Sequence, residues 1–214
     1  MPVITIEYEE LEELLGRRID LEELTNNFIK LGLDIEDVGE DWIKVEYNPN
    51  RPDYCSVEGI VRGLKGILEI ELGMPRYNVK KGEIQLYVDE GVKKVRPYIV
   101  CGVIRGLKLD DEKIQTLMNI QEQLHWAVGR DRKKAAIGVH DLDNVSPPFR
   151  YTTSKPDEIR FIPLGETEEM TLSEILEKHP KGVLYKDLLK SENYPIILDK
   201  NENVLSFPPI INSI

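Results

Sequence analysis

The sequence predicts an α+β protein with a small N-terminal α+β domain followed by a larger mixed α/β domain. Its 214 residues can bury more than one core, and segments with strand-like alternation are interspersed with segments of helical periodicity. Between Gly73 and Lys81 a stretch containing proline, glycine and lysine interrupts this pattern. We therefore expect one domain over residues 1–78 and a second over residues 79–214.

The first domain is expected to open with a strand, two acidic helices and a pair of strands joined around Gly39. The predicted elements are a strand over Pro2–Tyr8, helices over Glu9–Leu15 and Leu21–Leu31, and strands over Ile35–Val38 and Trp42–Tyr47. Asp20 is the expected N-cap of the second helix, and Gly32 is expected to end it.

A polar turn with two prolines, Asn48–Asp53, leads into the helix that we expect to form the core of the first domain. Apolar residues recur in this helix at the spacing that lines one helical face. They are Val57, Ile60, Val61, Leu64, Ile67 and Leu68. Either Asp53 or Ser56 can cap its N-terminus.

The second domain is predicted to combine short strands with three helices. The strands are expected at Ile84–Val88, Val95–Ile104, Ala135–Val139, Phe149–Thr152 and Ile159–Pro163. The helices are a long one that opens at Asp110 or Asp111, and two shorter ones near Leu172–Lys178 and Leu184–Leu189.

The closing stretch, Tyr194–Ser213, is the one around which the chain is expected to be organised. Two β-patterned runs, Pro195–Leu198 and Val204–Phe207, flank a polar turn, as a hairpin requires. Pro208 and Pro209 cannot donate backbone hydrogen bonds, so we expect the chain to leave the sheet there. The amide of Asn212 then follows a very apolar segment, where it either caps a strand end or serves a ligand.

A second amide, Gln121, interrupts the apolar stripe of the long helix. It lies four residues after Leu117 and three before Leu124, so it faces the same way as the expected core residues. An unpaired buried amide costs about 1 to 3 kcal/mol. Either a backbone partner or a ligand is therefore expected to satisfy Gln121, with Glu122 beside it on the helix surface.

Charge is distributed unevenly along the chain, whose net charge is −11. Residues 1–47 hold 14 acidic and 4 basic side chains, a net charge of −10, which leaves −1 for the remainder. The densest basic cluster consists of Arg130, Arg132, Lys133 and Lys134. This cluster could bind an anion, whereas the acidic N-terminal region would repel one. Basic clusters are also common on solvated surfaces that bind no ligand.

Metal, redox and nucleotide chemistry are not predicted. The cysteines and histidines lack metal-ligand or disulfide-framework spacing: Cys55, Cys101, His125, His140 and His179. His140 stands next to Asp141, but neighbours on a strand point to opposite faces, so a structural role is expected. No glycine-rich phosphate loop is present, which argues against ATP binding by this chain. Without a membrane-length apolar run or an N-terminal signal region, a cytoplasmic location is expected.

Four segments carry a resemblance to a known family: NPNRPDYCSVEGIVRGLKGIL, RPYIVCGVIRGLKLDDEKIQTLMNIQEQLH, KKAAIGVHDLD and VLSFPPIINS. In this order and spacing they resemble the N-terminal part of the phenylalanyl-tRNA synthetase β subunit of archaeal and eukaryotic type. NRPD followed by SVEGI is quite specific, and the AIG-HDLD and FPPIIN segments separate this type from the bacterial one. The resemblance covers nearly all of the chain.

The resemblance implies an accessory first domain and a second domain that edits, hydrolysing tyrosine wrongly attached to phenylalanine tRNA. It implies that four residues lie around the ester to be cleaved: Gln121, Glu122, Arg132 and Asn212. It further implies that Leu198 and Ser206 line the pocket for the tyrosine ring and hydroxyl, and that Leu164 contacts the terminal adenosine. An aminoacyl ester is already reactive, so such a site needs only a positioned water and an oxyanion donor.

The family's editing domain continues past the position of Ile214, so the chain is expected to be a fragment truncated at its C-terminal end. The resemblance implies two partners, the aminoacylated 3′ end of tRNA(Phe) and the α subunit of a heterotetrameric enzyme, and no membrane. ATP and Mg²⁺ are expected for the whole enzyme, and no cofactor for this fragment. The alternative function is a non-catalytic tRNA-binding or subunit-assembly module, which the acidic N-terminal region favours.

Overall fold

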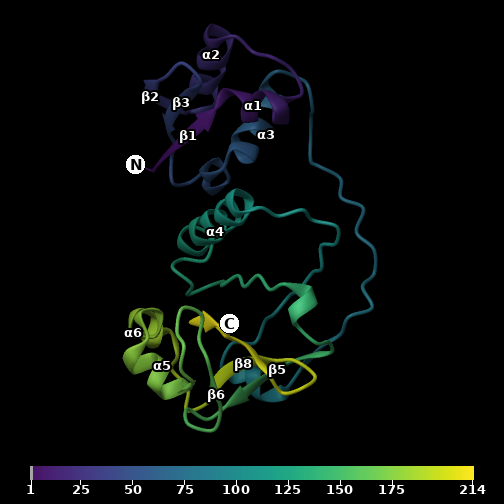
Figure 1. The fold of residues 1–214 in the computed structure, drawn as a ribbon, viewed down its shortest axis with the longest axis vertical. Coiled ribbons are helices and arrows are strands. Elements are labelled where there is room, and N and C mark those ends of the chain that lie inside the picture. The colour runs from purple at the N-terminus through teal and green to yellow at the C-terminus, as the bar shows by residue number, and fades with distance from the viewer. Residues whose placement is uncertain (1) are drawn as a thin grey trace. The chain divides into compact units, whose positions relative to one another are not determined.

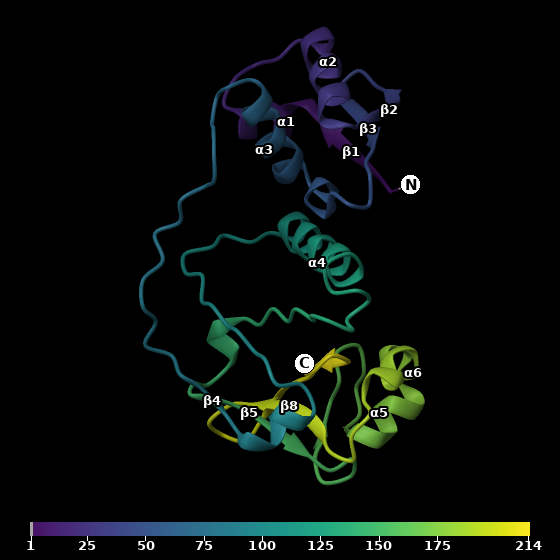
Figure 2. The same cartoon turned by 180° about the vertical axis from the view of Figure 1, so that it is seen from behind.

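The computed structural model describes residues 2–214, which fall into two compact units (Figures 1 and 2). Unit 1 comprises the chain up to Asn78 together with Lys108–Asp131, and unit 2 comprises Val79–Leu107 and Arg132–Ile214. The first segment of unit 1 ends at Asn78, which is also where the sequence predicts the domain boundary, but unit 1 includes residues 108–131 as well. Expected domains over 1–78 and 79–214 therefore stay a prediction. The α+β fold class is confirmed.

Unit 1 is built on a three-stranded antiparallel sheet in the order β1-β3-β2. Its first elements are β1 (Val3–Glu7), α1 (Tyr8–Leu15), α2 (Leu21–Leu31), β2 (Asp34–Val38) and β3 (Trp42–Glu46). The Asp20 side chain accepts a hydrogen bond from the Glu23 N–H at 2.8 Å, as its position before α2 predicts. Gly32 ends α2 with a φ of 75°, a left-handed conformation that glycine adopts at little cost.

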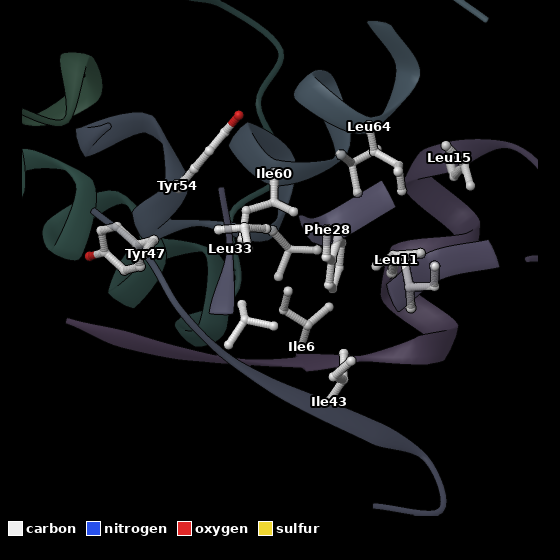
Figure 3. Packing of buried hydrophobic residues seen from close by; sticks show 14 residues of the cluster. Ile6, Leu11, Leu15, Phe28, Leu33, Ile43, Tyr47, Tyr54, Ile60 and Leu64 are labelled. Carbon is white, nitrogen blue, oxygen red and sulfur yellow. The ribbon is translucent and has the colours of Figure 1, made fainter. Parts of the chain in front are cut away.

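The core of unit 1 is completed by α3 (Val57–Ile67), which follows the 3₁₀ turn η1 (Pro52–Cys55). Ser56 caps α3 by accepting a hydrogen bond from the Gly59 N–H at 3.3 Å, which settles the choice between Ser56 and Asp53. Figure 3 shows the apolar face of α3 packed against the sheet and the other two helices. The labelled residues include Ile6, Leu11, Phe28, Ile43, Ile60 and Leu64, all fully buried.

Unit 1 also contains α4 (Asp111–Trp126), the long helix that the sequence predicts. Asp110 is its N-cap and accepts a hydrogen bond from the Lys113 N–H at 2.9 Å. The expected apolar stripe is not a core face, because Ile114 is 43% exposed and His125 is the buried residue of this helix. None of the helices in residues 2–214 combines the length and apolar character that crossing a bilayer requires.

Unit 2 is built on a five-stranded sheet in the order β10-β9-β8-β5-β4. Its strands are β4 (Leu86–Val88), β5 (Phe149–Ser154), β8 (Tyr194–Leu198), β9 (Val204–Phe207) and β10 (Ile211–Asn212). The β4–β5 pair is parallel and the other pairs are antiparallel. The predicted closing hairpin is confirmed as β8 and β9, and Asp199 fixes its turn by accepting hydrogen bonds from the N–H groups of Asn201 and Asn203.

The helices of unit 2 lie at one end of this sheet in both views of the fold (Figures 1 and 2). They are α5 (Leu172–Lys178) and α6 (Pro180–Tyr185), and short 3₁₀ turns occur at η2 (Glu90–Lys94), η3 (Leu142–Asn144) and η4 (Lys186–Leu188). The position of α5 is as predicted. The helix predicted near Leu184–Leu189 was misplaced, because Pro180 at the first helical position starts α6 earlier.

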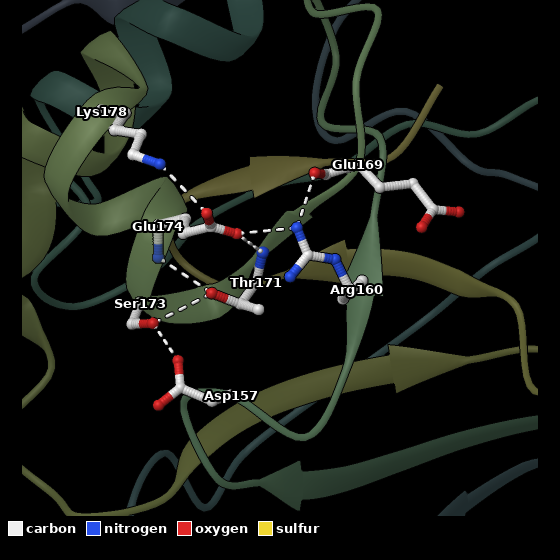
Figure 4. Close-up of polar contacts among 7 residues, drawn as sticks. All are labelled: Asp157, Arg160, Glu169, Thr171, Ser173, Glu174 and Lys178. Atoms are coloured by element: carbon white, nitrogen blue, oxygen red, sulfur yellow. Dashed lines mark hydrogen bonds and ion pairs between the residues drawn. The ribbon is translucent and has the colours of Figure 1, made fainter.

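A polar network holds the start of α5 against the small sheet of β6 (Arg160–Phe161) and β7 (Met170–Thr171) (Figure 4). Thr171 and Glu174 form a capping box, with 3.1 Å and 2.9 Å between the paired atoms. Glu174 also pairs with Arg160 at 2.9 Å and with Lys178 at 3.0 Å. The Thr171 N–H bond, followed by the Lys178 contact, lowers the pKa of Glu174 to about 2.

Two strand predictions were wrong. The segments Val95–Ile104 and Ala135–Val139 form no strands, and most of their apolar side chains are exposed, as for Tyr98 at 90% and Val100 at 96%. A β pattern becomes a strand only where another strand pairs with it, and neither segment has such a partner among residues 2–214. Conversely, the chain does not leave the sheet at Pro208 and Pro209: they form a turn, and β10 then pairs with β9.

Candidate functional site

The candidate site in unit 2 centres on Asn212, in the two-residue strand β10. Asn212 pairs with Ser206 in the antiparallel ladder between β10 and β9. On the other side of β10, the Leu164 N–H donates a hydrogen bond to the Asn212 carbonyl oxygen at 2.9 Å. The backbone of Asn212 is therefore held from both sides, which gives the side chain a fixed origin.

The side-chain amide of Asn212 is oriented by Ser206. The Ser206 hydroxyl, in a residue that is 7% exposed, donates to Asn212 Oδ1 at 2.9 Å. Asn212 Nδ2 donates no hydrogen bond to residues 2–214, and the residue is half-buried rather than sealed in the core. The amide thus keeps one oriented donor available to a ligand.

Gly138 lies beside the same amide, and His140 lies beside Gly138. A Cβ atom added to Gly138 would lie 3.3 Å from Asn212 Oδ1, 3.5 Å from Asn212 Nδ2 and 3.4 Å from His140 Nε2. His140 is exposed as a whole residue, yet desolvation of its ring lowers its pKa, which favours the neutral imidazole at pH 7. Sequence reasoning did not place these two residues in the site, although the AIG-HDLD segment contains both.

Arg132 contacts the turn that precedes β10. Its Nη1 donates to the carbonyl oxygens of Pro209 at 3.2 Å and Ile210 at 2.9 Å, and its guanidinium lies 4.6 Å from the centre of the Tyr185 ring. Arg132 is 7% exposed. It therefore belongs to the interior, unlike the exposed Lys133 that follows it in the basic cluster.

Leu198 and Leu164 differ in exposure. Leu198 is 2% exposed and packs in the apolar cluster of unit 2 with Ile196 and Phe207. Leu164 is 51% exposed, and its backbone N–H is the one bonded to Asn212. The structure thus brings Leu164 and Ser206 directly to Asn212, with Leu198 one strand further into the sheet.

Gln121 and Glu122 lie on α4 in unit 1. Gln121 is half-buried and makes no hydrogen bond to residues 2–214, so of the two expected alternatives, a backbone partner or a ligand, the backbone partner is not present. Glu122 is exposed, with Oε1 3.7 Å from His125 Nδ1. An open cavity of about 490 Å³ in unit 1 includes neither residue, and its lining consists of Pro49, Asn50, Pro52, Trp126, Ala127 and Val128.

The donors around Asn212 define what this site can do. A neutral amide on a fixed strand can stabilise negative charge that develops on an oxygen, without changing its own protonation. Its orientation is set in advance by Ser206, so little reorganisation is needed when a ligand arrives. These features suit a reaction in which negative charge develops on an oxygen of the ligand.

Comparisons with known proteins match nearly the whole chain to the same protein from several archaea. The chain is 51% identical over 214 residues to the phenylalanine–tRNA ligase beta subunit of Methanosphaera stadtmanae and 45% identical over 216 residues to that of Methanocaldococcus jannaschii. It covers 38% and 39% of these two relatives, so it spans well under half of their length. No protein-family model matches the chain.

A solved structure agrees with these relatives. A crystal structure of an N-terminal fragment of the phenylalanyl-tRNA synthetase beta subunit from Pyrococcus horikoshii superposes with a TM-score of 0.88 at 41% identity. The match covers 99% of this chain and 62% of that fragment. Sequence and fold therefore agree on the same relatives over the full length of the chain.

Proposed function

We propose that this chain, which belongs to the family of archaeal phenylalanyl-tRNA synthetase β subunits and corresponds to their N-terminal region, contains an editing module. Unit 2 hydrolyses the ester that links tyrosine to the 3′ end of tRNA(Phe). The activity of the whole ligase, its α-subunit partner, its cytoplasmic location and its use of ATP and Mg²⁺ are proposals for the longer protein.

The observation that carries this proposal is the held amide of Asn212. Its backbone is bonded to Leu164 and paired with Ser206, while its side chain keeps an available donor at Nδ2. Removing one such donor from an oxyanion site typically lowers kcat by about 10² to 10³-fold. A carboxamide in this setting therefore supplies a large part of the catalysis that a reactive ester requires.

The proposed reaction proceeds by attack of water on the ester carbonyl carbon. Asn212 Nδ2 donates a hydrogen bond to the carbonyl oxygen as negative charge develops on it, and the tetrahedral intermediate then releases tyrosine and the ribose hydroxyl. Gln121 and Glu122, which lie in unit 1, are assigned to the ester by resemblance. Arg132 has the same assignment, although its guanidinium is turned inward in this structure.

Selectivity for tyrosine is assigned to the pocket residues Leu198 and Ser206, and contact with the adenosine to Leu164. A site that hydrogen-bonds a substrate hydroxyl disfavours an analogue that lacks it, because the polar groups of the site are then left unpaired. The Ser206 oxygen still has acceptor capacity while it donates to Asn212. The same hydroxyl can therefore contribute both to the amide and to the tyrosine hydroxyl.

A second candidate function is a non-catalytic tRNA-binding or subunit-assembly module. Two observations favour it: the net charge of −10 over residues 1–47, which suits a protein partner more than RNA, and the exposed apolar side chains of Tyr98 and Val100. Hydrolysis separates the two functions. A purified, folded chain that deacylates neither tyrosyl-tRNA(Phe) nor phenylalanyl-tRNA(Phe) supports the second.

The decisive variant for the editing proposal is Asn212→Ala. In this chain, and in the complete β subunit paired with its α subunit, it should reduce tyrosyl-tRNA(Phe) hydrolysis by at least about 10²-fold. Attachment of phenylalanine by the complete enzyme should be unchanged. Asn212→Asp is the matched control, because it keeps the size and one acceptor but loses the donor. Near-normal hydrolysis by both variants, with a normal melting temperature, would reduce Asn212 to a strand cap.

A further inference from the structure

The buried guanidinium of Arg132 is the polar group of unit 2 that most needs an explanation. A charged side chain placed in the interior is unfavourable unless hydrogen bonds replace its contacts with water. Here Nη1 donates to two successive carbonyl oxygens, those of Pro209 and Ile210, and the planar group lies over the Tyr185 ring. Arginine suits this place because its flat guanidinium can donate and stack at once.

Further contacts hold Arg132 itself in place. The Arg96 side chain donates through Nη2 to the Arg132 carbonyl oxygen at 3.0 Å, and the buried Tyr151 hydroxyl donates to the Arg96 carbonyl oxygen at 2.7 Å. Arg132 also has a φ of 62°, in the left-handed region, where a side-chain-bearing residue persists only if its surroundings hold it. The site of the guanidinium is therefore built by several segments of unit 2.

The two carbonyl groups that Arg132 binds come directly before the strand that carries Asn212. This strand, β10, has only two residues, so its own ladder supplies little restraint. Ile210 is fully buried, and its carbonyl oxygen is the shorter contact of Arg132. Arg132 thus fixes the backbone from which Asn212 projects.

Ser206 provides the second restraint, on the side chain of Asn212 rather than on its backbone. It lies opposite Asn212 in the ladder and donates to Oδ1, which leaves the Nδ2 group to donate elsewhere. Loss of this hydroxyl would allow the amide to rotate about its last torsion angle, which is intrinsically broad.

We propose that Arg132 and Ser206 are positioning residues that act on the substrate through Asn212. Arg132 sets the position of the Asn212 backbone, and Ser206 sets the orientation of its amide. This inference rests on the proposed hydrolysis and differs from it in one respect: the guanidinium of Arg132 does not contact the ester.

A double-mutant cycle tests this inference in the purified chain, with single-turnover hydrolysis of tyrosyl-tRNA(Phe) as the readout. We expect Ser206→Ala and Arg132→Gln to lower the rate constant by about 10 to 10²-fold, the scale of a misplacement approaching 1 Å. Added to Asn212→Ala, Arg132→Gln should cause no further loss of more than about 2-fold, because residues that act through one group are not additive. A loss for Arg132→Gln that multiplies with that of Asn212→Ala would show direct contact with the ester and overturn the inference, whereas Ser206, which also lines the proposed tyrosine pocket, is tested by the amide resonances of Asn212.

A second measurement needs no substrate. The side-chain amide of Asn212 gives a pair of NMR resonances, which Asn212→Asp removes and so assigns. We expect Ser206→Ala to shift and broaden this pair, Ser206→Thr to restore it by returning a hydroxyl, and Arg132→Gln to broaden it. An unchanged pair in Ser206→Ala and Arg132→Gln would overturn the inference. If the wild-type chain is inactive, that result counts against the proposed function alone, and the resonances still decide the positioning.

Matched controls separate positioning from general damage. Arg150→Gln removes an arginine of β5 that pairs with Glu202 on the surface, and Ser154→Ala removes a buried hydroxyl of the same strand. Both should leave the Asn212 resonances and hydrolysis unchanged. If Arg132→Gln does not fold, the Ser206 variants decide the outcome. If the two control variants change the Asn212 resonances as much as the test variants do, the proposal is contradicted.

Discussion

Gly138→Ala is the variant for which the structure gives the sharpest expectation at the candidate site. Gly138 is exposed and does not have a positive φ, so its backbone accepts alanine without strain. The added Cβ would lie 3.3 Å and 3.5 Å from the two amide atoms of Asn212, and 3.4 Å from His140 Nε2. At such distances the neighbouring side chain must move by a few tenths of an ångström.

The size of the effect follows from that displacement. Misplacing a catalytic group by about 1 Å costs about 10²-fold in rate, so a shift of a few tenths of an ångström corresponds to about 3- to 10-fold. The free energy of unfolding should change by less than about 1 kcal/mol, because the restriction that alanine places on the unfolded chain offsets the cost of displacing the neighbouring side chains.

Hydrolysis of tyrosyl-tRNA(Phe) under single-turnover conditions, with thermal melting of the same samples, measures both effects. Gly102→Ala is the matched control, since Gly102 also lies in an exposed extended segment, has no positive φ and has nothing within 4 Å of an added Cβ. Equal hydrolysis by the two variants would refute the assignment of Gly138 to the site. A fall in the melting temperature that corresponds to clearly more than about 1 kcal/mol would refute the conclusion that the backbone of Gly138 accepts alanine without strain.

Two further predictions concern stability. Gly59→Ala should destabilise unit 1 by about 3 kcal/mol or more, because the added Cβ would lie 1.7 Å from the Asp53 carbonyl oxygen. Gly66→Ala in the same helix has nothing within 4 Å of the added Cβ and should stabilise the unit by about 0.5 to 1 kcal/mol. Chemical denaturation compares the two variants, and equal effects would contradict the close approach of η1 to α3. The pKa of Glu174 is lowered from 4.5 to about 2, so its contribution to stability is complete above pH 4.5 and is lost as the pH falls toward 2. As the pH is lowered from 4.5 toward 2, the melting temperature of unit 2 should therefore fall less in Glu174→Gln than in the wild type. An identical pH dependence of the melting temperature in the two proteins would refute this role of Glu174.

Local chemistry made much of this fold predictable from the sequence. Asp20 and Ser56 cap their helices and Gly32 ends one, because each satisfies backbone groups only a few residues away. The strands predicted at Val95–Ile104 and Ala135–Val139 failed for the opposite reason. Their alternation of apolar residues indicates that they could form strands, but it does not say whether another segment of the chain pairs with them.

The same distinction applies to the candidate site. Asn212 could be singled out from the sequence, because a polar amide after two prolines and an apolar run stands out there, and its role at an ester stays a prediction. The burial of Arg132 was not, since the carbonyl groups that hold it lie 77 and 78 positions further along the chain. Gly138 could not be found at all, because the absence of a side chain becomes meaningful only when its neighbours in space are known.

The position of Asn212 depends on parts of unit 2 that are far apart in sequence, and this dependence links activity to stability. Phe207 and Ile210 are fully buried on either side of the Pro208–Pro209 turn. The core therefore anchors this turn in addition to the hydrogen bonds from Arg132. The Leu164 N–H comes from a different segment again. A short strand restrained only by such contacts loosens when any of them weakens, while the larger strands stay paired. Substitutions that loosen this part of the core should therefore reduce hydrolysis at temperatures below those at which the unit unfolds.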